Sequence, residues 1–378
     1  MSKTIFCTIV SASYLNQALT SIESLQSYHK DFDYLVAVID IEEEFIFREN
    51  NLQIISIHDL IKMYPEIENF YSYYSVIETI CALKPFVTRY LLNEYNTVIY
   101  GDSDTFYYNH MSLNSENLTL GGFTPHRLTP SSENNIFANS FDISIIKYGY
   151  FNLGFFVVTR KDLKFLDWWI RKLTYECLYA PEMFLFVDQK WIDLGIHFFE
   201  LSSIKDETIN IGPWNLDERL LSKVDGQYFV NGKKLTMIHF SGVSDSNPMS
   251  HLDAFYSLNR ETSLELGESL VNFTELSKEW LRFQVNIHIK YEGLIVRVVN
   301  LERKTFTQLS YFKRAKKIEE VRSGKLVRYR SNLISSFINE ISSKMDSILC
   351  NLDSYKYART YFSSDLKKMR SLFNRFFP

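Results

Sequence analysis

Apolar residues near the start of the chain alternate between short unbroken runs and regularly spaced positions. TIFCTIV at 4–10 is apolar and β-branched, and the segment 11–28 after it repeats leucine and isoleucine at helical spacing. YLVAVID at 34–40 and LQIISI at 52–57 are two further apolar runs of strand length. Unbroken runs of this kind predict buried strands, and spaced apolar positions predict an amphipathic helix. The strand–helix–strand order indicates an α/β fold of Rossmann-like type, with a mainly parallel sheet and helices on both faces.

The middle of the chain continues this pattern. Residues 66–93 predict two helices broken near Pro85, because proline removes a backbone donor from a helix. The run 96–100 predicts a buried strand that leads directly into Gly101-Asp102-Ser103-Asp104. Residues 109–150 are polar and irregular, which predicts a long loop. Further predicted elements are a strand at 151–159, helices at 162–178 and 185–195, and a strand at 233–242 that ends on His239-Phe240-Ser241-Gly242.

After residue 260 the pattern is almost wholly helical, and the charge balance changes as well. Residues 301–378 carry 17 basic and 7 acidic side chains, which leaves 24 basic and 38 acidic ones for residues 1–300. A charge asymmetry of this size predicts two modules. We therefore expect a catalytic domain at 1–260 and a basic, mainly helical module at 261–378.

The composition fits a globular protein with a sizeable core, since 46% of the residues are hydrophobic and 23% are charged. No stretch approaches the ~20 consecutive apolar residues of a membrane-spanning helix, and the N-terminus indicates a first strand rather than a signal peptide. Cys7, Cys81, Cys177 and Cys350 are far apart and form neither a disulfide framework nor a CxxC metal motif. These features predict a cytoplasmic protein.

Asp102 and Asp104 are the first candidates for chemistry, because they follow a predicted buried strand. In such an i, i+2 pair both carboxylates can reach one ion if the backbone bends, and Gly101 permits a bend. Hard carboxylate oxygens suit Mg²⁺ or Mn²⁺, and a diphosphate would complete the coordination. A solvated turn is the alternative interpretation. His239 ends another predicted strand, where it is either a third ligand or a hydrogen-bonded strand-end histidine.

Three further groups of residues allow either a functional or a purely structural role. Asp188-Gln189 lies in an apolar helical context, where a carboxylate either caps the helix or points into a site. Asn152-Leu153-Gly154 starts a predicted strand and is either a turn or an amide presented to a hydroxyl. Trp214-Asn215 follows Gly212-Pro213, and the aromatic ring either stacks on a sugar or fills the core.

An ordered series of motifs gives the chain a resemblance to a known family. The series is CALKPF, VIYGDSDT, FNLGFFVVTR, DWWIRKL, LFVDQKWIDL, INIGPWNLDER and VNGKKLTMIHFSG, and it spans roughly residues 4–260. In this order and spacing the motifs resemble the GT-A-fold glycosyltransferases, in particular a bacterial group related to glycosyltransferase family 8. Two features differ from the usual pattern: Gly101 stands where a large apolar residue is common, and no lysine follows HFSG.

The resemblance implies a nucleotide-diphosphate-sugar donor, UDP- or GDP-linked, and a divalent cation, Mn²⁺ or Mg²⁺. It implies that Asp102, Asp104 and His239 bind the cation and that Lys84 meets the donor phosphates or sugar. Asp188 would be the base of an inverting reaction or would orient the sugar in a retaining one, and retention is the favoured outcome. The other implied residues have two roles: nucleotide or donor binding by Ser11, Tyr14, Asp40, Ser103 and Gly242, and sugar or acceptor binding by Asn152, Gly154, Gln189, Trp214 and Asn215.

The implied acceptor is a glycan, a glycolipid or a protein-linked group, in the synthesis of bacterial surface polysaccharides or glycoconjugates. A metal-dependent phosphoester hydrolase would use the same carboxylates, and a non-catalytic carbohydrate-binding protein is a further alternative. A dinucleotide oxidoreductase is disfavoured, because SASY rather than GxGxxG follows the first predicted strand. Nucleic-acid binding is disfavoured because residues 1–300 are acidic.

The basic C-terminal module contains two amphipathic segments. Leu333, Phe337, Ile341 and Met345 fall on one helical stripe, and residues 361–378 interleave aromatic rings with lysine and arginine. This combination predicts peripheral binding to an anionic membrane surface. Packing on the acidic catalytic domain and a contact within a homo-oligomer are the alternatives.

Overall fold

The computed structural model describes most of the first 294 residues and a few residues beyond them. The described residues are 3–43, 45–111, 121–130, 138–244 and 260–294, with Leu252, Tyr256, Val298, Ala315 and Ile318. The chain divides into two units, Met1–Arg314 and Ala315–Pro378. All elements named below belong to the first unit. The amphipathic segments predicted for the C-terminal module lie outside the described residues.

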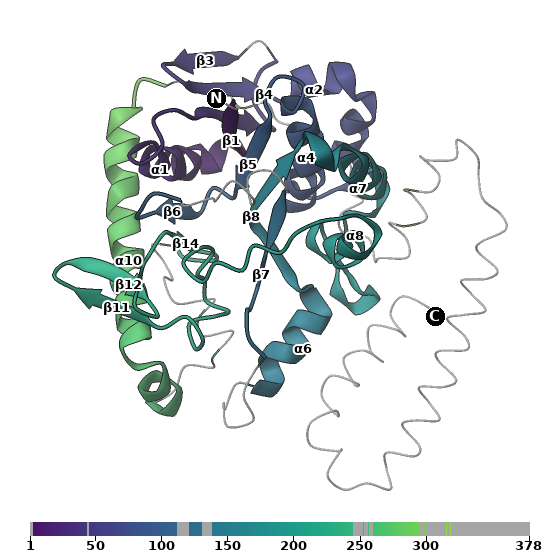
Figure 1. Cartoon of the computed structure of the whole chain (residues 1–378). Coiled ribbons are helices and arrows are strands. Elements are labelled where there is room, and N and C mark those ends of the chain that lie inside the picture. Colours follow the sequence, from purple (N-terminus) through teal and green to yellow (C-terminus); the bar gives the residue numbers. More distant parts are fainter. Residues whose placement is uncertain are drawn as a thin grey trace, which may run out of the picture. The chain divides into compact units, whose positions relative to one another are not determined.

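A seven-stranded sheet forms the centre of the first unit (Figure 1). Its strands are β1 (Thr4–Val10), β2 (Asp33–Val38), β3 (Ile46–Glu49), β4 (Leu52–Ser56), β5 (Thr97–Gly101), β7 (Gly122–Pro125) and β8 (Phe151–Thr159). The order in space is β3-β4-β2-β1-β5-β8-β7. β4, β2, β1 and β5 are parallel neighbours, whereas β3 and β8 run antiparallel to the strands beside them.

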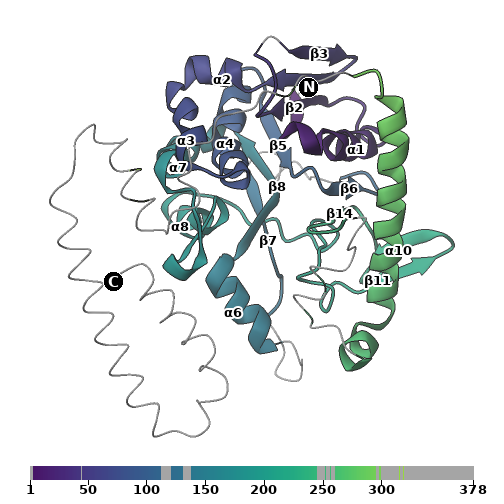
Figure 2. The ribbon, with the colours of Figure 1, turned by 180° about the vertical axis from the view of Figure 1, so that it is seen from behind.

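Helices cover both faces of this sheet (Figures 1 and 2). On one side lie α1 (Leu15–Gln26) and α10 (Arg260–Lys290), and on the other side lie α2 (His58–Met63), α4 (Val76–Leu91) and α7 (Leu163–Glu176). Among the described residues, further α-helices are α3 (Phe70–Tyr73), α6 (Ala138–Tyr148) and α8 (Ile192–Phe198). Short 3-10 turns occupy Ala12–Tyr14, Pro65–Asn69, Arg160–Asp162, Pro181–Met183 and Gln189–Trp191. The predicted fold class, a mainly parallel α/β sheet with helices on both faces, is confirmed.

The central strands follow from their sequences. Strand β8 is buried along its whole length, and β5 is likewise buried at every position. Interior strands with both faces covered by helices need unbroken apolar runs rather than alternation, and FNLGFFVVT and TVIYG supply them. The edge strand β3 is largely exposed and carries the charged residues Arg48 and Glu49.

The predicted break near Pro85 is wrong, because α4 runs through this residue without interruption. The helix starts at a capping box, in which Ser75 and Glu78 exchange hydrogen bonds. The helix is buried from Cys81 to Thr88, and Lys84 is among these buried residues. Tertiary packing therefore outweighs the hydrogen bond that the Pro85 nitrogen cannot make.

Two other segments differ from their predicted elements. The stretch 109–150, predicted as a loop, contains β7 and α6 among its described residues. The segment 185–195, predicted as one helix, begins as strand β10 (Leu185–Phe186), which pairs with β9 (Tyr179–Ala180). Helical structure starts only at Gln189.

Smaller sheets carry the later part of the chain. β6 (Thr105–Tyr107) pairs antiparallel with β14 (Met237–His239), which sets His239 opposite Thr105. β11 (Leu221–Val224), β12 (Gln227–Val230) and β13 (Lys233–Lys234) form a three-stranded antiparallel sheet. The strand predicted at 233–242 is therefore two short strands in different sheets.

Helix α10 packs on the later part of the first unit. Phe240 stacks on Trp280 with ring centroids 4.8 Å apart, and Phe273 belongs to the same apolar cluster. The predicted boundary between residues 260 and 261 falls at the start of this helix, whereas the first unit extends to Arg314. Among the described residues, no helix combines the length and the apolar sequence needed to span a bilayer.

Candidate metal and donor site

The candidate carboxylates lie on a turn between β5 and β6. The backbone N–H of Asp102 donates to the Gly154 carbonyl at 2.9 Å, and the N–H and hydroxyl of Thr105 donate to the Asp102 carbonyl. Gly101 is the last residue of β5, and a side chain on it would lie 2.6 Å from the ring of Phe6. Close packing of this ring leaves no room for a larger residue at position 101.

Asp102, Asp104 and His239 form a group whose ligand atoms all lie within 4.8 Å of one another. The pairing of β6 with β14 brings His239 beside Asp104, so that His239 Nε2 lies 3.1 Å from Asp104 Oδ1. Burial alone would lower the pKa of His239 and raise the pKa of Asp104, but their attraction outweighs burial and shifts both pKa values the other way. Two carboxylates and an imidazole fit Mn²⁺, and with added water or phosphate oxygens they also fit Mg²⁺.

Lys84 lies between two carboxylates beside this group. Its Nζ is 3.2 Å from Asp102 Oδ1 and 3.0 Å from Asp188 Oδ2, and it donates to the Leu153 carbonyl at 3.0 Å. Burial would lower the pKa of Lys84, but the two carboxylates outweigh it and raise the pKa, so the ammonium stays charged. The Tyr100 hydroxyl also donates to Asp102 Oδ1, at 2.8 Å. Both contacts fall on Oδ1 of Asp102.

Asp188 is presented by a sharply turned segment. Phe184 and Val187 before it have φ angles of 59° and 39°, a left-handed conformation that costs about 1–2 kcal/mol for residues of this kind. Asp188 precedes the turn Gln189–Trp191 but makes no capping hydrogen bond with its side chain. Its carboxylate instead contacts Lys84, and burial raises its pKa although Lys84 opposes this. Of the two alternatives, the structure selects the carboxylate that points into the site.

These charged groups line a cavity of about 710 Å³. Much of the remaining lining is aliphatic or aromatic: Ile77, Ile145, Tyr148, Tyr179, Phe186 and Trp214. The Phe186 ring lies 5.0 Å from that of Tyr179 and 4.9 Å from that of Tyr148. Aromatic faces beside hydrogen-bonding groups are suited to sugar rings, which have both apolar faces and polar edges.

The cavity brings together most of the site residues predicted from the sequence. Its lining contains Lys84, Asp102, Asp104, Asn152, Gly154, Asp188, Gln189, Trp214 and His239. Six predicted residues lie outside the lining: Ser11, Tyr14, Asp40, Ser103, Asn215 and Gly242. Ser11 and Asp40 follow β1 and β2, and the Ala12 N–H donates to Asp40 Oδ1 at 2.7 Å. They therefore share the carboxyl edge of the sheet with Asp102, where ligands bind in open α/β sheets.

Two of the residues predicted to bind the sugar or the acceptor, Asn215 and Gly154, have structural roles. Asn215 is fully buried, and its Nδ2 donates to the carbonyls of His126 and Asn210. Gly154 lines the cavity, but a Cβ on it would collide with Cε1 and Nδ1 of His239. In the structure, Gly154 makes room for the imidazole of the metal group.

His126 and Arg127 are cavity residues that the sequence did not single out. Burial lowers the pKa of His126 to about 4, so that its ring is neutral, and its Nδ1 lies 3.2 Å from the Tyr150 carbonyl. Arg127 forms a two-pronged ion pair with Asp217, at 2.7 and 3.0 Å. Both residues lie in the stretch predicted as a loop, whose sequence TPHRLT carries no periodic signal.

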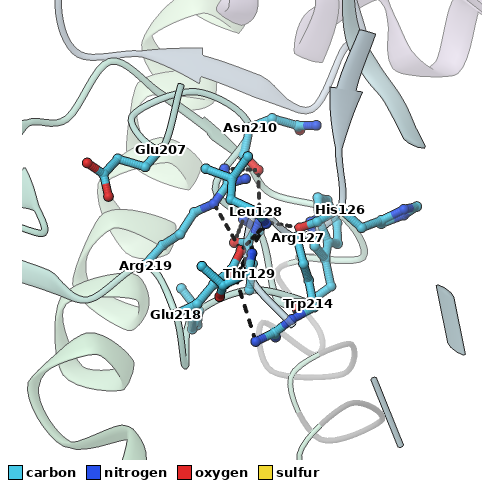
Figure 3. Close-up of polar contacts among 12 residues, drawn as sticks. His126, Arg127, Leu128, Thr129, Glu207, Asn210, Trp214, Glu218 and Arg219 are labelled. Atoms are coloured by element: carbon cyan, nitrogen blue, oxygen red, sulfur yellow. Dashed lines mark hydrogen bonds and ion pairs between the residues drawn. The ribbon is translucent and has the colours of Figure 1, made fainter. Parts of the chain in front are cut away.

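A buried ionic cluster holds the segment with His126 and Arg127 in place (Figure 3). Glu218 accepts hydrogen bonds from the N–H groups of Leu128 and Thr129, each at 3.0 Å, and from the Thr129 hydroxyl at 2.7 Å. Its carboxylate also lies 3.6 Å from Arg219 Nε. Burial lowers the pKa of Arg219 to about 10, so the guanidinium remains charged at neutral pH. The cluster fixes the backbone that presents His126 to the cavity.

Comparison by sequence finds a bacterial relative but no matching family model. No protein-family model matches the chain. Over 250 residues the chain is 26% identical to the uncharacterized protein YfnF of Bacillus subtilis (strain 168). The aligned part covers 63% of this chain and 80% of YfnF.

Two glycosyltransferases and a mutant of one of them are among the solved structures similar to this one. Mouse xyloside xylosyltransferase 1, in its apo form, is 15% identical, with a TM-score of 0.40 over 66% of this chain and 99% of that one. The galactosyltransferase LgtC, in complex with donor and acceptor sugar analogues, is 14% identical, with a TM-score of 0.39 over 69% of this chain and 99% of LgtC. An active-site mutant of LgtC is 12% identical and has a TM-score of 0.41 over the same shares.

Proposed function

We propose that this chain is a metal-dependent glycosyltransferase that takes a sugar from a UDP- or GDP-sugar. One observation carries the proposal: a single cavity contains the metal group Asp102, Asp104 and His239, the buried and charged Lys84, and an aromatic wall. The aromatic wall consists of Tyr148, Tyr179, Phe186 and Trp214. A phosphoester hydrolase would need the metal group alone. The aromatic wall and the Lys84–Asp188 pair favour a substrate that is both a diphosphate and a sugar.

The donor is assigned to the carboxyl edge of the sheet. Asp102, Asp104 and His239 would hold Mn²⁺ or Mg²⁺, and when bound the cation would offset the charge that grows on the leaving diphosphate. Ser11, Tyr14 and Asp40 would hold the nucleoside, because they follow β1 and β2 at the same edge. Ser103 and Gly242, which adjoin the metal group in sequence, would meet the diphosphate.

Lys84 and Asp188 act on either side of the bond that breaks. Lys84 is charged and fixed by two carboxylates, so it supplies a fixed positive charge beside the metal group that stabilises the negative charge developing on the leaving diphosphate. Asp188 orients the sugar and offsets positive charge at the anomeric carbon. Because Lys84 contacts one oxygen of Asp188, we favour this role and a retaining transfer over a role as general base.

The acceptor is assigned to the aromatic part of the cavity. The rings of Trp214, Tyr148 and Phe186 line it together with Asn152 and Gln189. This lining suits a glycan, free or linked to lipid or protein, and we place the reaction in bacterial polysaccharide or glycoconjugate synthesis in the cytoplasm. Binding of an anionic membrane through the basic C-terminal segment remains a prediction from the sequence.

The test is a panel of UDP- and GDP-sugars supplied with Mn²⁺ or Mg²⁺. We expect thermal stabilisation by at least one donor, and release of nucleoside diphosphate that requires the cation. Asp102→Asn should lower the turnover rate about 10²- to 10³-fold, because the cation that offsets charge on the leaving diphosphate loses a carboxylate ligand.

Asp167→Asn is the matched control, since Asp167 pairs with Arg89 on the surface and its side chain is 51% exposed. This variant should keep full activity. No response to any donor, or full activity of Asp102→Asn, would sink the proposal. Cation-dependent cleavage of simple phosphoesters without release of nucleoside diphosphate would instead favour the hydrolase.

A further inference from the structure

The imidazole of His239 can serve as a ligand only through a nitrogen that carries a lone pair. Its two ring nitrogens are not equivalent in the structure. Nε2 faces Asp104 Oδ1 at 3.1 Å, whereas Nδ1 faces Asn210 Oδ1 at 3.2 Å. Which nitrogen carries the hydrogen therefore depends on how the amide of Asn210 is oriented.

The orientation of this amide is fixed by a neighbouring group that can only donate a hydrogen bond. The Gly154 N–H can only donate, and it donates to Asn152 Oδ1 at 3.0 Å. Asn210 lies 3.1 Å from the same oxygen, so its nearer atom is the donor Nδ2. Nδ2 also donates to Thr124 Oγ1 at 2.8 Å. The oxygen of Asn210 is consequently the atom that faces His239, and Nδ1 of the imidazole must carry the hydrogen.

His126, at the other end of this hydrogen-bond network, independently indicates the same orientation of the Asn152 amide. The Tyr150 carbonyl can only accept, so the nearby Nδ1 of His126 carries a hydrogen and Nε2 of that neutral ring is an acceptor. Nε2 of His126 lies 3.3 Å from Asn152 Nδ2, which is therefore the donor side of the Asn152 amide. This again turns Asn152 Oδ1 toward Asn210.

The backbone holds Asn210 firmly in this role. Asn210 is fully buried and has a φ angle of 60°, a left-handed conformation that asparagine tolerates better than most residues. Its carbonyl accepts from Arg219 Nη1 and from Asn215 Nδ2, and Arg219 Nη1 also donates to the Ile209 carbonyl at 2.6 Å (Figure 3).

We propose that Asn210 is a positioning residue of the metal group, which accepts the Nδ1–H of His239 and so keeps the Nε2 lone pair directed at the cation. The inference rests on the proposed function only in that a divalent cation must bind at Asp102, Asp104 and His239. Hydrogen bonds of this type orient ligands and typically change metal affinity about 10- to 100-fold.

The first test measures Mn²⁺ and Mg²⁺ affinity of the full chain by titration calorimetry, without any nucleotide-sugar. Asn210→Ala removes the acceptor and should weaken binding about 10- to 100-fold. Asn210→Asp keeps an acceptor oxygen toward His239 and tolerates the left-handed conformation, although it loses the donor Nδ2, and it should retain more affinity than Asn210→Ala. Asn231→Ala is the matched control, because Asn231 is also left-handed, with a φ angle of 49°, and lies on the β12–β13 turn.

The second test determines which ring nitrogen of His239 carries the hydrogen. Nitrogen NMR of histidine-labelled protein with Mg²⁺ should show His239 protonated at Nδ1 in the wild type and in Asn210→Asp, with His239→Gln identifying the signal. Should Asn210→Ala fail to fold, Thr124→Val removes one partner of Asn210 Nδ2 and should weaken binding in the same direction by a smaller factor.

Equal cation affinity in the wild type and in Asn210→Ala, or in Thr124→Val where Asn210→Ala does not fold, would overturn the role of Asn210 and leave the proposed function standing. An Nε2–H tautomer in the cation-bound wild type would do the same. A wild type that binds neither cation would overturn both.

Discussion

The imidazole of His239 occupies the space that a side chain at position 154 would need. A Cβ there would collide with the ring and lie 2.9 Å from Asn152 Oδ1. The clash involves a buried ring held by β14 and by Asn210 rather than the end of a flexible side chain. A methyl group at position 154 would therefore displace His239, the third ligand, from its place.

Gly154→Ala should therefore damage cation binding as well as folding. We expect Mn²⁺ affinity to fall at least about 10-fold, while overfilling of a packed site lowers the free energy of unfolding by about 1–3 kcal/mol. Calorimetry and urea unfolding of the same samples measure the two effects. Gly293→Ala is the control, since a Cβ there meets no atom within 4 Å. Unchanged cation affinity in Gly154→Ala would show that His239 is not needed as a ligand.

Among the elements, the segment 126–129 is held mainly by side chains of another segment, 217–219. Glu218 receives its backbone N–H groups, and Asp217 pairs with Arg127. The carboxylate of Glu218 is almost completely buried beside Arg219, with side-chain exposures of 8% and 2%. Removal of such a partner leaves a buried charge uncompensated, which is costlier than the loss of a surface pair.

Glu218→Ala should lower the free energy of unfolding by about 3 kcal/mol or more, because it leaves Arg219 buried without its carboxylate. Urea unfolding followed by tryptophan fluorescence measures this change. The control is Glu207→Ala, whose partner Lys233 is 67% exposed and whose loss should change stability by less than about 1 kcal/mol. Equal effects of the two substitutions would show that the cluster contributes no more than a surface pair.

The sequence predicts the parts of the site that lie at the ends of apolar strands. Asp102, Asp104 and His239 were predictable for this reason, and Lys84 and Asp188 followed from the resemblance of their motifs. Asn210 and His126 were not predictable. The role of Asn210 depends on a left-handed backbone, and His126 lies in a segment without periodicity. Helix α4 was divided at Pro85 because local propensity carries no information about the packing that surrounds it.

For the molecule as a whole, two neutral histidines link folding to pH. Burial, together with the charge of His110, lowers the pKa of His29 to about 4, and burial lowers the pKa of His126 to about 4. Nε2 of His29 accepts the Met111 N–H at 3.0 Å, which a protonated ring could not do. Between pH 6.5 and 4 the unfolded chain therefore binds protons that the folded protein does not, and stability falls as the pH falls.

His29→Gln should remove part of this dependence. Between pH 7 and 5 the wild type should lose about 1–2 kcal/mol more stability than the variant, because the pKa of an unfolded histidine is near 6.5. Urea unfolding at pH 7, 6 and 5 gives the difference, and exposed His197→Gln serves as the control. The metal-free His239–Asp104 pair has the opposite sign, since a raised histidine pKa stabilises below pH 6.5 and is lost as the pH rises. An identical pH slope in wild type and His29→Gln would show that His29 takes up its proton in the folded protein.

The antiparallel pairing of β14 with β6 places His239 opposite Thr105, next to Asp104. Successive side chains of a strand point to opposite faces, so a slip of one residue would turn His239 away from the carboxylates. A cation that binds only the correctly paired form also raises the population of that form by mass action. Cation stoichiometry is therefore a quality measure for purified samples: the bound fraction reports how many molecules have docked β14 in the correct register.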